Sequence, residues 1–78
     1  MNVSQIEVAR SIISMSLEVS IEDVPENASM DTFAPWDSLG HLRIVAQIEE
    51  HLNRSLEIEE VLGVIDCATI SNLIENNP

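Results

Sequence analysis

Pro35-Trp36-Asp37-Ser38-Leu39-Gly40-His41-Leu42 marks the point where a long irregular segment ends and the most strongly patterned helix of the chain begins. Asp37 suits the position before a helix, because its carboxylate can accept hydrogen bonds from first-turn N–H groups that have no intrahelical partner. Ser38 is then the first helical residue, and its hydroxyl is expected to face solvent. The stretch therefore predicts a helix start that presents a serine at the surface.

The helix predicted over residues 37–52 has an apolar arc wider than one core contact requires. At about 100° per residue, one apolar sector contains these side chains: Ile44, Val45, Ile48 and Leu52, with His41 among them. An apolar stripe of roughly 100° is enough for a surface helix to cover one core. We therefore expect the flanking sector to be partly exposed and to contact partner proteins. That strip consists of Leu39, Leu42 and Ala46.

Weaker patterns predict the remaining elements. Residues 5–17 carry a helical stripe that opens with the capping-box pattern of Ser4 and Glu7, and Arg10 is expected to face water. Residues 18–36 have no regular periodicity, which predicts a loop. Apolar residues recur in it, and we expect them to pack against the helices and hold the loop in place. These residues are Val19, Ile21, Val24, Met30 and Phe33.

Two further helices follow the central one. A helix of one or two turns is expected around residues 59–62, ending at Gly63, and Asp66 or Thr69 caps a last helix. The sequence thus predicts an all-α protein with a single domain over residues 1–78. Its fold is a small four-helix bundle, with three longer helices, a short third helix, and a long loop between the first and second.

Composition narrows the class of partner. The formal net charge is −11, with no lysine among the three basic residues. Nucleic acids and anionic membranes are recognised by clustered positive charge, so neither is an expected partner, whereas a basic protein surface is. Cys67 is the only cysteine, and His41 and His51 lie ten residues apart, so no metal site is expected. Without a membrane-length apolar run or a signal sequence, the expected location is the cytoplasm.

The Asp37-Ser38-Leu39 motif, at the start of the second long helix of a small acidic chain, resembles the attachment motif of acyl carrier proteins. The order of helices agrees with that family over nearly the whole chain. The resemblance implies that a phosphopantetheinyl transferase attaches 4′-phosphopantetheine from coenzyme A to the Ser38 hydroxyl. It also implies that an acyl group is carried on the distal sulfur as a thioester, and that the chain itself is not an enzyme.

The resemblance also suggests which residues surround the group and meet partners. Asp37, Leu39 and His41 would lie beside the prosthetic group on Ser38. The chain would act as a monomer that docks onto basic patches of the transferase and of the acyl-loading and acyl-using enzymes. The residues expected to make these contacts are Leu39, Leu42, Ala46, Glu49, Glu50, Glu57, Glu59 and Glu60.

The sequence departs from fatty-acid-synthesis carriers at three positions of this region. Gly40 stands where those carriers often have aspartate, Arg43 where they commonly have an acidic residue, and Trp36 where a small or aliphatic residue is usual. The form is more similar to carriers of specialised or cell-surface polysaccharide pathways.

Other interpretations of the same residues remain open. A peptidyl or aminoacyl carrier would use Ser38 in the same way, and an acidic interaction bundle would not modify it at all. An esterase using Ser38 with His41 is disfavoured, because the chain lacks the Gly-x-Ser-x-Gly elbow. For His41, packing at the rim of the bundle is favoured over contact with the prosthetic group, and for Trp36 a role as an anchor for the end of the loop is favoured over a contact with partners.

Overall fold

The computed structural model describes residues 5–76, and the elements of this segment are all helical. The helices are α1 (Gln5–Leu17), the 3₁₀ turn η1 (Ile21–Asp23), α2 (Ser38–Leu52), α3 (Ile58–Gly63) and α4 (Cys67–Glu75). The predicted small helical bundle is confirmed, with α3 as the short helix. The cap predicted at Ser4 lies outside the described residues.

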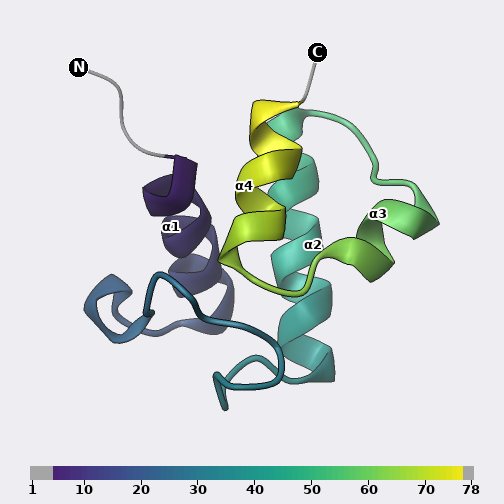
Figure 1. Cartoon of the computed structure of the whole chain (residues 1–78). Helices are drawn as coiled ribbons and strands as arrows, with labels where there is room; N and C mark the ends of the chain where they lie inside the picture. Colours follow the sequence, from purple (N-terminus) through teal and green to yellow (C-terminus); the bar gives the residue numbers. More distant parts are fainter. Residues whose placement is uncertain (1–4, 77–78) are drawn as a thin grey trace.

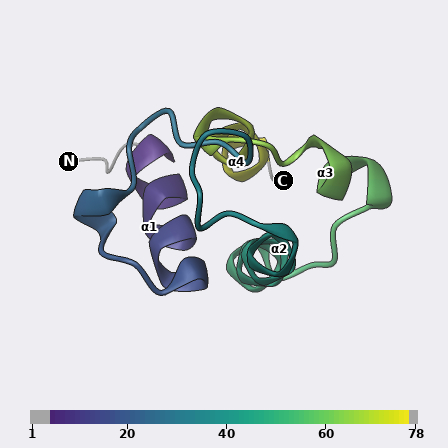
Figure 2. The same ribbon diagram turned by 90° about the horizontal axis from the view of Figure 1, so that it is seen from below.

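An aliphatic core lies where α1 packs against both α2 and α4 (Figure 1). Figure 2 shows these three helices standing around the core, with α3 outside the group. The buried side chains that the three helices supply are mostly β-branched or small. They include Ala9, Ile12 and Ile13 from α1, Ile44, Ile48 and Leu52 from α2, and Cys67 and Ile70 from α4.

Cys67 is the first residue of α4, and its side chain is fully buried. Burial raises the pKa of the Cys67 thiol, so the group stays protonated and packs as a small apolar side chain. None of the helices within residues 5–76 combines the length and the apolar character needed to cross a membrane.

The loop between α1 and α2 is held to the helices only partly through the residues that the sequence indicated. Val24 is fully buried and Val19 and Phe33 are partly buried, as expected. Ile21 and Met30 are each 37% exposed, so their side chains do not hold the loop as expected; at these two residues it is held through the backbone. Ala28 and Trp36 are buried in addition to Val24, because the chain turns back toward the core at these points.

The side chain of Arg10 holds η1 against α1, although the Ile21 side chain is not buried. Its Nε donates to the Val24 carbonyl at 2.7 Å and its Nη2 to the Ile21 carbonyl at 2.9 Å. Its Nη1 pairs with the Glu7 carboxylate at 2.7 Å. The expectation that Arg10 faces water is therefore wrong, because the guanidinium satisfies the Val24 carbonyl and adds a second donor to the Ile21 carbonyl, which also accepts from the Val24 N–H.

Backbone hydrogen bonds join the middle of the loop between α1 and α2 to the segment that leads into α4. The Met30 N–H donates to the Ile65 carbonyl at 3.0 Å, and the Cys67 N–H donates to the Ala28 carbonyl at 3.2 Å. The loop thus crosses from α1 to α4 before it returns to begin α2.

Candidate functional site

The start of α2 is capped by Asp37, as the sequence predicted. Asp37 has an extended backbone, with φ −99° and ψ −170°, and its Oδ1 accepts a hydrogen bond from the Gly40 N–H at 2.8 Å. Its backbone carbonyl accepts from the His41 N–H at 2.8 Å. Asp37 thus satisfies the Gly40 N–H of the first turn with its side chain, and its carbonyl accepts the first regular hydrogen bond of the helix.

Ser38 is the first residue of α2, and its side chain is exposed. Within residues 5–76, its hydroxyl has no hydrogen-bond partner, and the N–H groups of Ser38 and Leu39 have none either. The hydroxyl is uncommitted because Asp37, and not Ser38, supplies the cap. The site therefore combines a free hydroxyl with two free N–H donors at the positive end of a 15-residue helix.

Gly40 lies against the end of α1 and the end of the loop. A Cβ atom at this position would lie 2.5 Å from Leu17 Cδ2 and 3.1 Å from the Pro35 carbonyl oxygen. A larger side chain has no room here unless these neighbours move. The close approach gives a physical reason for glycine at this position.

His41 is fixed by contacts on both sides of its ring. The Trp36 Nε1–H donates to His41 Nδ1 at 3.2 Å, and His41 Nε2 lies 3.2 Å from the Val61 carbonyl oxygen. Trp36 is 2% exposed, which confirms it as an anchor for the end of the loop. With both nitrogens engaged, the imidazole offers no free nitrogen to a group on Ser38, either as a phosphate contact or as a base.

The flanking strip of α2 is exposed, as predicted. Leu39 is 58% exposed, Leu42 is 64% exposed, and Ala46 is also exposed. Because α2 packs against α1 through its other side, these side chains form no part of the core. Their contact with partner proteins remains a prediction.

The structure adds exposed apolar side chains on and after α3 that the sequence did not indicate as a surface. Ile58 is 68% exposed, Leu62 is 72% exposed, and Ile65 is 51% exposed. Ile58 and Leu62 are four residues apart, a spacing that ordinarily indicates a buried helix face. No signal in the sequence therefore separates them from core residues.

The acidic residues expected to meet partners divide into two groups. Glu50, Glu57 and Glu59 are exposed. Glu49 instead accepts a hydrogen bond from the Leu56 N–H at 2.9 Å, and Glu60 forms an intramolecular ion pair. The first three carboxylates are thus the more accessible to a basic partner.

The ion pair of Glu60 is bidentate. Arg54 Nη1 donates to Glu60 Oε1 at 3.0 Å and Arg54 Nη2 to Glu60 Oε2 at 2.9 Å. The hydrogen bonds from Arg54, with one from the Glu57 N–H, lower the pKa of Glu60 to about 2. The Glu60 carboxylate in turn raises the pKa of Arg54. The pair ties α3 to the segment that follows α2.

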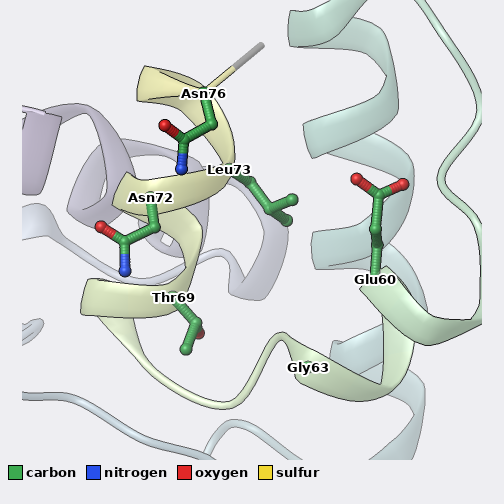
Figure 3. A pocket seen from close by; sticks show the side chains of 6 residues that line it. All are labelled: Glu60, Gly63, Thr69, Asn72, Leu73 and Asn76. Atoms are coloured by element: carbon green, nitrogen blue, oxygen red, sulfur yellow. The ribbon is translucent and has the colours of Figure 1, made fainter.

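A cleft of about 380 Å³ opens between α3 and α4 (Figure 3). In this view Leu73 extends from α4 toward α3, whereas Asn72 and Asn76 lie along the other side of α4. All the lining residues come from α3 and α4 with its cap: Glu60, Gly63, Thr69, Asn72, Leu73 and Asn76. The cleft is separate from the turn formed by Asp37 and the first residues of α2, here called the Ser38 turn. The two features belong to different helices.

Comparison of the sequence with models of known protein families finds no match, and comparison with curated proteins finds none either. Within residues 5–76, no group of three or more histidine, cysteine or acidic side chains is placed to hold a metal ion.

Proposed function

We propose that this chain is an acyl carrier protein that bears 4′-phosphopantetheine on Ser38. The observation that carries the proposal is the uncommitted, exposed Ser38 hydroxyl at the first residue of α2. Serine near a helix start commonly acts as the cap itself, but here Asp37 takes that role. The hydroxyl is thus left available to another enzyme.

The surroundings of Ser38 fit a phosphodiester. The free N–H groups of Ser38 and Leu39 are donors at the positive end of α2, where a phosphate is favoured. The first turn of α2 contains no acidic side chain, and the neighbouring Asp37 carboxylate is engaged with the Gly40 N–H. When attached, the prosthetic group supplies a thiol on a long flexible arm, which none of the twenty side chains provides.

The role of Ser38 in this proposal is that of an acceptor, with the catalysis supplied by partner enzymes. A serine nucleophile needs an adjacent base, and both nitrogens of His41 are engaged elsewhere. The net charge of −11 and the exposed Glu50, Glu57 and Glu59 suit partners with basic docking patches. The exposed strip of Leu39, Leu42 and Ala46 would supply apolar contacts beside the modified serine.

The cargo is proposed only as an acyl or aminoacyl group. The cleft between α3 and α4 offers a volume of about 380 Å³, lined by Leu73 and by polar residues, as a place where part of a cargo could rest. Trp36 and Gly40 set this chain apart from fatty-acid-synthesis carriers and favour a specialised or polysaccharide-related pathway.

The test is an intact-mass measurement after incubation with coenzyme A and a broad-specificity phosphopantetheinyl transferase. The native chain should gain the mass of one phosphopantetheine, and Ser38→Ala should gain none. Ser55→Ala is the matched control, because Ser55 is also exposed but lies outside the helices, and this variant should be modified like the native chain.

Absence of any gain on the folded native chain would overturn the proposal and leave an interaction bundle without a prosthetic group. Gain on Ser38→Ala would show that the attachment site is wrong. Given modification at Ser38, loading assays with acyl and aminoacyl donors then separate the two kinds of carrier.

A further inference from the structure

Three groups from different parts of the chain form a continuous set of contacts beside Ser38. Trp36 lies at the end of the loop, His41 in the first turns of α2, and Val61 in α3. The Trp36 and His41 rings are nearly parallel, with an interplanar angle of 19° and centroids 6.3 Å apart. Hydrogen bonds of 3.2 Å connect His41 Nδ1 to the indole N–H and His41 Nε2 to the Val61 carbonyl oxygen.

The partners determine which nitrogen of His41 carries the proton. An indole N–H can only donate, so Nδ1 must accept, and a carbonyl oxygen can only accept, so Nε2 must donate. The two partners therefore match the tautomer in which Nε2 carries the proton. A side chain with a single polar end, such as glutamine, cannot reproduce both bonds with the same geometry.

The contact with Val61 holds the middle of α3, which has no buried residue of its own. A second side-chain link is the partly exposed Arg54–Glu60 pair, and the core is reached at the two flanks of the helix, through Leu56 and the fully buried Val64. On the other side of His41, its partner Trp36 is buried and immediately precedes Asp37, which caps α2. His41 thus connects the turn that presents Ser38 with the helix beside it.

We propose that His41 is a positioning residue that holds the Ser38 turn and α3 together as one docking surface for the enzyme that modifies Ser38. It acts through Trp36 and Val61 and does not touch the reacting atoms. The inference rests on the proposed carrier function. It predicts that loss of His41 weakens recognition of the chain and leaves the chemical step unchanged.

The main variant is His41→Phe, which keeps an aromatic ring but removes both nitrogens. Exchange of the Trp36 indole N–H should become faster. Exchange of the Val61 N–H, which donates to the Glu57 carbonyl and reports opening of α3, should also become faster, while exchange of core amides in α1 should not. In the transferase assay, KM for the chain should rise about three- to tenfold, the range expected for loss of the hydrogen bond that holds α3, with kcat within about twofold. His51→Phe is the control, because His51 is exposed near the other end of α2.

His41→Gln provides a rescue and keeps the proposal testable if the phenylalanine variant folds poorly. Its amide can donate to the Val61 carbonyl as Nε2 does, so protection of α3 and KM should return toward the native values. Equal impairment of the glutamine and phenylalanine variants would overturn the role assigned to the Val61 bond.

The outcomes separate this inference from the proposed function. Failure of the native chain to accept phosphopantetheine would remove both proposals. Modification of the native chain, with KM unchanged in His41→Phe, would overturn the positioning role alone. Unchanged exchange at Val61 in that variant would show that His41 does not hold α3.

Discussion

The group of α1, α2 and α4 and the short helix α3 are held in different ways. The three longer helices meet through fully buried aliphatic side chains such as Ile13, Ile48 and Ile70. Over Ile58–Gly63, by contrast, no residue is buried: α3 itself makes polar contacts, and the chain reaches the core at the flanking Leu56 and at the fully buried C-cap Val64. The difference indicates that the core supplies most of the stability of the fold, and that the residues of α3 contribute less to it.

The largest expected effect comes from opening a cavity in the core. Ile48→Ala should lower the free energy of unfolding by about 2–5 kcal/mol, because Ile48 is fully buried and the vacated space cannot fully close. Urea unfolding followed by far-UV circular dichroism measures the change. Ile58→Ala is the matched control: Ile58 is 68% exposed, so the same truncation should change stability by no more than about 0.5 kcal/mol. Equal losses in the two variants would contradict the comparison.

Gly40→Ala should have the next largest effect, because it crowds the junction of α1, the loop and α2. The added methyl group would lie 2.5 Å from Leu17 Cδ2 and 3.1 Å from the Pro35 carbonyl oxygen. Overpacking should outweigh the gain in helix propensity and lower stability by about 1–2 kcal/mol. In a Leu17→Ala background the cost should be smaller, and an unchanged cost there would assign the strain to the backbone of Pro35.

Loss of the cap on α2 should have a smaller effect. Asp37→Ala removes the acceptor for the Gly40 N–H and should cost about 1 kcal/mol in thermal or urea unfolding. Asp37→Asn keeps a side-chain oxygen at this position and should cost only a few tenths of a kcal/mol, since asparagine caps helices nearly as well. A large loss in the asparagine variant would point to a role for the charge itself.

The smallest and most local effect concerns the ion pair of α3. The pKa of Glu60 is about 2 in the folded chain and 4.5 ordinarily, so its stabilising contribution is fully present above about pH 4.5. The contribution is lost as the pH falls through about 2. NMR titration should show the Glu60 carboxylate and α3 amides changing together at the acid end of this range.

Arg54→Gln provides the control for this titration. It removes the donors that hold the Glu60 pKa low, so the midpoint should move up toward the ordinary value. Titration of Glu60 near pH 4.5 in the native chain would contradict the bidentate pair.

Much of the candidate site follows from local rules in the sequence. The cap at Asp37, the exposed Ser38 hydroxyl and the exposed strip of Leu39 and Leu42 were all predicted from residue type and helical spacing. Such features depend on contacts within about one turn of helix, which the order of residues fixes directly.

Contacts between elements distant in sequence were not predicted, and the reason is the same in each case. The side chain of Arg10 is polar and was expected in water, but it meets the carbonyls of Ile21 and Val24. Ile58 and Leu62 have the spacing of a buried face, but α3 stands outside the bundle and leaves them exposed. Periodicity gives the face of a helix on which a residue lies, but not what that face meets.

The sequence alone therefore determined the helices, their order, and the serine presented at the start of α2, because these depend on backbone propensity, capping and amphipathic period. Tertiary structure alone decided that His41 connects Trp36 with Val61, that Gly40 lies against Leu17, and that α3 has no buried residue. These features depend on how the helices and the loop approach one another in space. That approach is set by packing of the whole aliphatic core and is not encoded in any short stretch of the chain.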